Sequence, residues 1–167
     1  MHKDMKKIII LAAAMLLSAS ALAQDGKSIY QKYSDSKGVS SVYVSPAMFR
    51  LMKRIPDIDM GKGDVNLSPI IRSLDGLYII NAEDSGIGEA LRKDVEKFVS
   101  KGEYELLLEA KDNGDKVEIY TVGNSKVITS FVLLALEPGE STFICFTGQI
   151  PREELEKTIG AAAGMMD

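Results

Sequence analysis

Two glutamates, Glu109 and Glu118, are the clearest pair of side chains in this sequence that could do chemistry. Asn113-Gly114 predicts a two-residue hairpin turn, and counting outward from it places Glu109 opposite Glu118. Like charges at that spacing repel, and catalytic acids use such repulsion to raise the pKa of one carboxyl group. The pair is therefore a candidate for a carboxylate-based hydrolase. Lys111 and Lys116, diagonally beside both glutamates, favour instead a neutralised carboxylate pair on a solvated surface.

Three aspartates, Asp57, Asp59 and Asp64, are the weaker candidates for a metal site. Asp57-Ile58-Asp59 begins like a calcium-binding loop, and calcium prefers oxygen ligands. However, Gly61 and Lys62 occupy the positions where a ligand and the turn glycine of such a loop belong. A calcium-dependent activity remains an alternative, and no dedicated metal site is expected.

Histidine and cysteine usage excludes several enzyme classes. His2 is the only histidine and lies in the expected leader segment, and Cys145 is the only cysteine. A mature chain without histidine has no Ser-His or Cys-His nucleophile and no histidine-containing zinc site. Cys145 stands in the apolar string FICF, which predicts a small buried hydrophobe. The Gly86-Ile87-Gly88 turn lacks the third glycine of a dinucleotide-binding loop, so no cofactor is expected.

Residues 1–23 have the layout of a secretory signal peptide. A lysine-rich start precedes the apolar run Ile8–Leu17, and Ala21-Leu22-Ala23 matches the small-x-small cleavage pattern. We expect cleavage before Gln24 and export to the periplasm or the cell surface. The alternative is a retained N-terminal anchor. The mature chain, residues 24–167, is expected to form a single domain without a transmembrane segment.

The charge of the mature chain disfavours nucleic acid as a partner. Removal of the leader takes three lysines and one aspartate from 20 basic and 24 acidic residues, which leaves a net charge of −6. Nucleic-acid binding depends on Lys and Arg side chains that neutralise phosphates. We therefore expect a protein or small-ligand partner in the envelope, and the sequence leaves a homodimer open.

The region from Tyr104 to Thr147 predicts a four-stranded β-meander. Its four apolar strings are separated by Asp112-Asn113-Gly114-Asp115, Gly123-Asn124 and Pro138-Gly139, which are strong turn signals. The preceding part predicts two strands, near 40–44 and 77–80, and helices that open at Ser45-Pro46, Ser68-Pro69 and Asp84 or Ser85. Further helices are expected over 25–37 and after Pro151. The fold class is therefore α+β, with a largely antiparallel sheet built on this C-terminal meander and helices packed against it.

The register of the first hairpin predicts which of its faces is buried. Counting from the turn pairs Leu106 with Thr121, Leu108 with Ile119 and Ala110 with Val117 on an apolar core face. The other face pairs Leu107 with Tyr120, Glu109 with Glu118 and Lys111 with Lys116, facing water. The strands around 131–136 and 143–146 are apolar on both faces and so predict cover on both sides, by helices, a second subunit or an apolar ligand.

Three strings in the mature chain are similar to a known family: KYSDSKGVSSVYVSPAMFRLM, LDGLYIINAED, and YELLLEAKDNGDKVEIYTV continuing to FTGQI. They resemble small exported Bacteroidetes proteins that are grouped as domain of unknown function 4252. The resemblance implies export and a domain that covers nearly all the mature chain. Many members look like lipoproteins, and this chain departs from that pattern because no cysteine follows its signal. The family brings no catalytic or binding residues with it.

These observations favour a non-catalytic exported envelope protein that acts through protein or small-ligand binding. One alternative is a periplasmic carboxylate-based hydrolase or a calcium-dependent activity. Another is a carrier of an apolar ligand, since two strands need cover on both faces.

Overall fold

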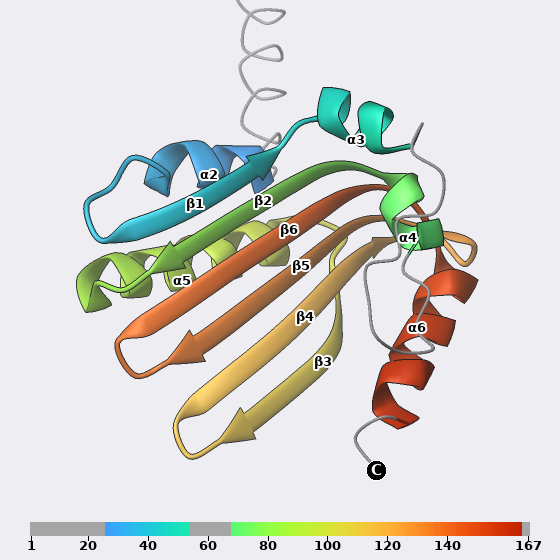
Figure 1. Cartoon of the computed structure of the whole chain (residues 1–167). Coiled ribbons are helices and arrows are strands. Elements are labelled where there is room, and N and C mark those ends of the chain that lie inside the picture. The colour runs from blue at the N-terminus through green and yellow to red at the C-terminus, as the bar shows by residue number, and fades with distance from the viewer. Residues whose placement is uncertain (1–25, 54–67, 165–167) are drawn as a thin grey trace, which may run out of the picture.

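The structure is a computed structural model that describes residues 26–53 and 68–164. Its centre is one six-stranded antiparallel sheet in the order β1-β2-β6-β5-β4-β3 (Figure 1). The strands are β1 Val39–Val44, β2 Leu74–Ala82, β3 Glu105–Asp112, β4 Asp115–Gly123, β5 Val127–Glu137 and β6 Glu140–Pro151. The predicted α+β class and the four-stranded meander are confirmed, and β1 and β2 extend the sheet beyond β6.

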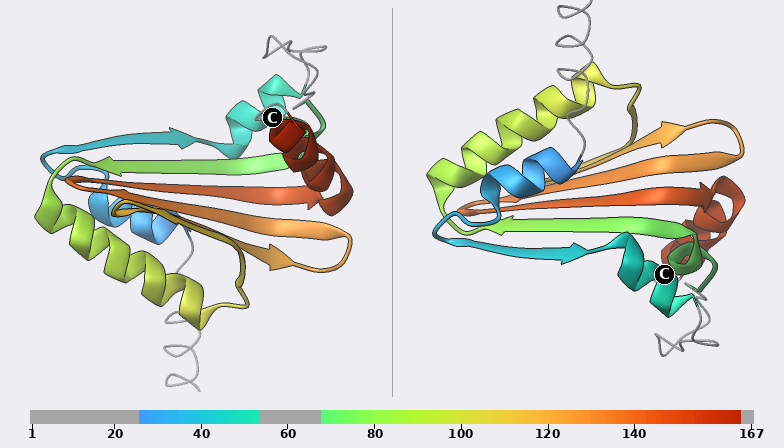
Figure 2. Two further views of the ribbon diagram at one scale, coloured as in Figure 1. Left: turned by 90° about the horizontal axis from the view of Figure 1, so that it is seen from below. Right: turned by 90° about the horizontal axis from the view of Figure 1, so that it is seen from above.

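The helices divide between the two faces of the sheet (Figure 2). Helices α2 (Gly26–Tyr33) and α5 (Ser85–Lys101) cover one face, and α3 (Pro46–Met52), α4 (Ser68–Ser73) and α6 (Arg152–Gly164) lie at one end of the other. Among the described residues, no helix is both long and apolar enough to cross a membrane.

The main core lies between the sheet and helices α2 and α5. Leu91, Val95 and Phe98 of α5 are buried against the sheet, and they follow the 3.6-residue period that the sequence shows. Phe143 and Cys145 of β6 are fully buried in the same cluster, which confirms the predicted burial of the cysteine. At the start of α5, Asp84 Oδ1 accepts hydrogen bonds from the backbone N–H groups of Gly86 and Ile87, as an N-cap does.

A second, smaller core lies at one end of the opposite face. Phe49 of α3, with Leu74, Ile128 and Ile150 of the sheet, is buried there, and Ile70 of α4 and Leu155 of α6 pack against this cluster. α3 and α4 are short, and all three helices stand at the same end of the sheet, so they cover only that end (Figure 1).

The hairpin of β3 and β4 confirms part of the predicted register and corrects the rest. Asn113 and Gly114 have φ values of 48° and 96°, the left-handed conformation that a two-residue hairpin turn requires. The four predicted pairs nearest the turn are formed. The pairing then shifts at Leu107, so that Leu106 faces Tyr120 and Thr121 faces Glu105. The predicted pairs Leu106–Thr121 and Leu107–Tyr120 are therefore wrong, because a β-bulge inserts one extra residue.

The prediction of which hairpin face is covered by the protein was also wrong. Glu118 and Tyr120 share a face with the buried residues Leu134 and Val132 of β5, on the side of the sheet that α5 covers. Glu118 is therefore buried, whereas Leu108 is 44% exposed on the opposite face. Apolar and charged side chains still point to opposite faces of the hairpin, but α5 packs on the face that carries the charges.

Candidate functional site

The main candidate site is the part of the sheet that no described helix covers, which we call the open face. Its central row crosses all six strands, because each residue is the register partner of the next. The row consists of Val42, Ile79, Ile144, Leu133, Ile119 and Leu108. Six apolar side chains thus stand side by side on one surface.

Two further rows of the register complete the open face. The row towards the β5–β6 turn consists of Ser40, Asn81, Thr142, Ala135, Val117 and Ala110. The row towards α4 and α6 consists of Val44, Leu77, Phe146, Phe131, Thr121 and Glu105. Glu105, at the β3 edge, is the one charged residue of these rows, so the rest of the open face is a continuous neutral surface.

Exposure alternates along β5, in the middle of the sheet, whereas in β4 the open-face residue Thr121 is buried. In β5, Val132 and Leu134 are fully buried under α5, whereas Phe131 and Leu133 are only partly buried. At the two edges of the central row, Val42 and Leu108 are 48% and 44% exposed. The expected cover on both sides of β5 and β6 is therefore present on one face and only at one end of the other.

An apolar cavity of about 70 Å³ lies where the open face meets α4 and α6. It is lined by Ile70, Leu74, Phe131, Phe146, Ile150 and Leu155. Phe131 and Phe146 pack against each other with ring centroids 5.8 Å apart, and they belong to both the cavity and the open face. The cavity has room for one apolar side chain or a short alkyl group.

Acidic side chains border the opposite end of the open face. Asp112 pairs with Asp115 at the β3–β4 turn, and Glu137 pairs with Glu140 at the β5–β6 turn. Each of these residues lies two positions beyond an open-face residue of its own strand. Side chains two positions apart on a strand point to the same face of the sheet, so all four point to the side of the open face. We call these four residues the acidic rim. Their charge repels anions and favours cations at that end.

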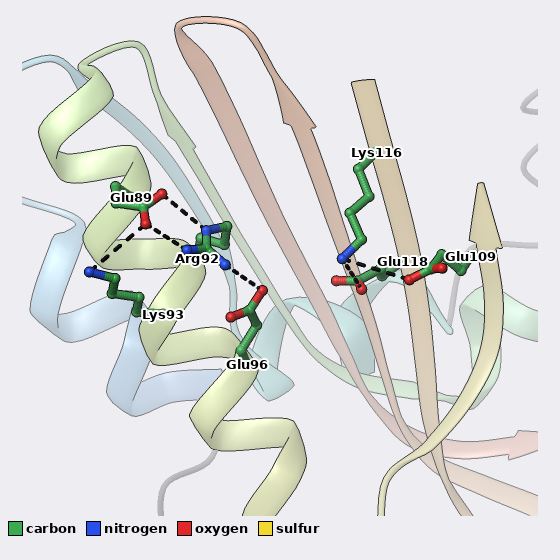
Figure 3. A network of polar contacts seen from close by, with 7 residues as sticks. All are labelled: Glu89, Arg92, Lys93, Glu96, Glu109, Lys116 and Glu118. Atoms are coloured by element: carbon green, nitrogen blue, oxygen red, sulfur yellow. Dashed lines mark hydrogen bonds and ion pairs between the residues drawn. The ribbon is translucent and has the colours of Figure 1, made fainter. Parts of the chain in front are cut away.

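The structure brings the predicted pair Glu109 and Glu118 opposite each other on the α5 face (Figure 3). Lys116 Nζ lies 2.6 Å from Glu118 Oε1 and 3.7 Å from Glu109 Oε2, and Lys111 Nζ lies 2.9 Å from Glu109 Oε1. The Glu118 side chain is only 6% exposed, which corrects the predicted surface position for this residue. Its Oε2 is buried without a hydrogen-bond partner among the described residues.

The lysines shift the titration of their neighbours. The hydrogen bond from Lys111, with the charges of both lysines, holds the pKa of Glu109 below its ordinary value. The hydrogen bond to Glu118 raises the pKa of Lys116 in turn. Burial, followed by the negative charge of Glu118, raises the pKa of Tyr120. A general acid needs a carboxyl pKa that is raised, so the shift of Glu109 runs in the opposite direction.

Polar groups on α5 lie beside this pair without forming a reaction site with it. Arg92 binds Glu89 and Glu96 on its own helix (Figure 3). A polar cavity of about 200 Å³ lies near Arg92 and Ser141 at the β5–β6 turn. Neither Glu109 nor Glu118 lines that cavity. The two predicted carboxylates therefore do not converge on it.

The predicted metal candidates Asp57, Asp59 and Asp64 lie outside the described residues. Within residues 26–53 and 68–164, no group of three or more His, Cys, Asp or Glu side chains is arranged to hold a metal ion.

Sequence reasoning identified only the middle of the open face, at β5 and β6, as a surface that needs cover by helices, a second subunit or an apolar ligand. The two-sided apolar pattern of β5 and β6 was the available signal, and it was interpreted as cover on both sides. The position of β1 and β2 beside β6 was the missing information, because it extends the apolar row across the whole sheet.

Comparisons with curated proteins and with solved structures gave no significant match to this chain. The family described as a domain of unknown function (DUF4252) matches residues 33–158, a range that includes all six strands and ends within α6. On this match, the chain belongs to the DUF4252 family.

Proposed function

We propose that this chain is a non-catalytic exported envelope protein that binds another protein through the open face. The observation that carries the proposal is the central row of six apolar side chains across the whole sheet. Exposed apolar patches of such extent mark interaction sites on water-soluble domains.

The shape of the surface favours a protein over a small apolar ligand. Sites for drug-sized ligands are concavities of roughly 300–1,000 Å³ that enclose most of the ligand. The apolar cavity beside the open face measures about 70 Å³ and serves better as a socket for one anchoring side chain. Carriage of an apolar ligand therefore has less support than protein binding.

The charged pair on the α5 face gives little support to the hydrolase alternative. Lys116 contacts both carboxylates, and the pKa of Glu109 is lowered. The polar cavity near Arg92 would bring a substrate to neither glutamate. These contacts are those of a structural ion-pair network.

Export is part of the same proposal and rests on the signal-like pattern of residues 1–23. N-terminal sequencing of the protein from its native host is expected to begin at Gln24, in the periplasmic or cell-surface fraction. A chain that retains Met1 in the cytoplasmic fraction would contradict export.

A photo-crosslinking residue at Leu108 is expected to trap the partner in the native host. The matched control is the same residue at Leu106, because both leucines lie on β3, are 44% and 49% exposed, and face opposite sides of the sheet. We expect a discrete higher-mass protein adduct from position 108 and none from 106. No protein adduct from position 108, or equal adducts from both positions, would refute binding through the open face.

A further inference from the structure

We infer that the protein that covers the open face is a second copy of this chain, stacked face to face about a two-fold axis along the central row. This inference rests on the proposed function, because it names the partner for the same surface. In this arrangement each strand of one copy crosses the same strand of the other.

The size of the open face matches the requirement of a dimer. Six strands about 4.8 Å apart and three rows two residues apart give a projected area of about 600 Å². A standard interface takes about 800 Å² of accessible surface from each partner. Side chains that stand on the sheet expose more area than their projection, so two open faces together reach this class.

The β3 edge of the sheet is poorly suited to the alternative dimer, in which strands pair edge to edge. β3 is an edge strand that is exposed along its whole length, but the bulge at Leu107 interrupts its regular hydrogen-bonding pattern. Glu109 and Lys111 add an ion pair on the same strand. Bulges and charged side chains are the features that keep edge strands from pairing with another chain. The open face therefore has more support as the interface than the β3 edge has.

The acidic rim selects the orientation of the second copy. A two-fold axis parallel to the strands would place the two acidic rims over each other, and eight carboxylates would repel across the interface. An axis along the central row reverses the strand direction and separates the two rims to opposite ends of the dimer. The neutral rows then meet in the middle, at the aligned angle and about 10 Å spacing of stacked sheets.

The first test measures the oligomeric state of the purified mature protein by sedimentation velocity from about 1 to 100 µM. We expect a concentration-dependent dimer that Leu108→Asp weakens at least about tenfold, because each substitution places a charge against its own copy. Leu106→Asp, on the other face of the same strand, should leave the dimerisation constant within about twofold. A monomer at 100 µM, or equal effects of the two substitutions, would overturn the inference.

The second test determines the orientation with a short bismaleimide cross-linker in a Cys145→Ala background. Val42→Cys is expected to cross-link to its own copy, since β1 crosses the partner's β1 only when the axis follows the central row. Glu137→Cys, in the acidic rim, should not cross-link, because the rims lie at opposite ends. Cross-linking of Glu137→Cys without Val42→Cys would overturn this orientation. Both positions are exposed, so the variants are expected to fold.

The two proposals fail in different ways. A purified protein that stays monomeric, together with a Leu108 adduct to a different protein in the native host, would overturn the dimer and leave protein binding standing. A Leu108 adduct with the mass of two copies supports both. The absence of any protein adduct from position 108 counts against both.

Discussion

Leu134→Ala is expected to lower the free energy of unfolding by about 2–5 kcal/mol, the usual cost of truncating a buried leucine. Leu133→Ala, at the neighbouring position of the same strand, should cost only about 1 kcal/mol at protein concentrations that keep the chain monomeric. The physical reason is the difference between the faces: Leu134 is fully buried under α5, and Leu133 stands in the partly exposed central row. Urea denaturation of the two variants and the wild type measures both values.

The same pair of variants responds differently to protein concentration. If a second copy covers the open face, the cost of Leu133→Ala should grow as the concentration is raised, whereas that of Leu134→Ala should not. Equal costs for both variants at every concentration would mean that Leu133 is as well covered as Leu134 within one chain. That result would contradict the open face itself.

Lys116→Met is expected to destabilise the protein by about 3 kcal/mol, because it removes the cation from a buried carboxylate. Glu118 is only 6% exposed and has one oxygen without a hydrogen-bond partner among the described residues, so water does not readily replace the lysine. The double variant Lys116→Met/Glu118→Leu should recover most of the loss, since it removes the charge together with its partner. Urea denaturation at neutral pH of the two single variants and the double variant completes the cycle.

Lys111→Met is the matched control on the same face of the hairpin, directly opposite Lys116. Its side chain is 64% exposed, compared with 28% for Lys116, and its partner Glu109 is itself partly exposed. We expect a loss below about 1 kcal/mol, as for most surface ion pairs. An equal loss of stability in Lys111→Met and Lys116→Met would contradict the claim that burial of Glu118 makes Lys116 the more important lysine.

Local residue patterns were sufficient to predict the strands and the turn of the meander. Asn113-Gly114 predicts a left-handed two-residue turn, and the turn fixes the four nearest pairs of the hairpin by counting. The bulge at Leu107 was not predictable in this way. Residues 106–108 are all leucine, so the alternation of apolar and polar residues is the same wherever the extra residue is inserted. No local signal therefore marks the position of the bulge.

The burial of Glu118 could not be predicted from the hairpin alone. Alternation divides the hairpin into an apolar and a charged face, and it does not say against which face a helix from elsewhere in the chain will pack. α5 follows β2 and covers the charged face, where Tyr120 supplies apolar surface and Lys116 neutralises the carboxylate. The usual rule, that the apolar face of a hairpin is buried, fails here for that reason.

The sequence by itself determined the α+β class, the order of strands in the meander, the buried cysteine and the four hairpin pairs nearest the turn, because these depend on residues close together in the chain. Only the tertiary structure decided where β1 and β2 join the sheet and which face the helices cover. Those two choices depend on contacts between distant segments, such as β2 with β6 and α5 with β6. Together they align six apolar residues from six strands into the open face, which no single stretch of the sequence reveals.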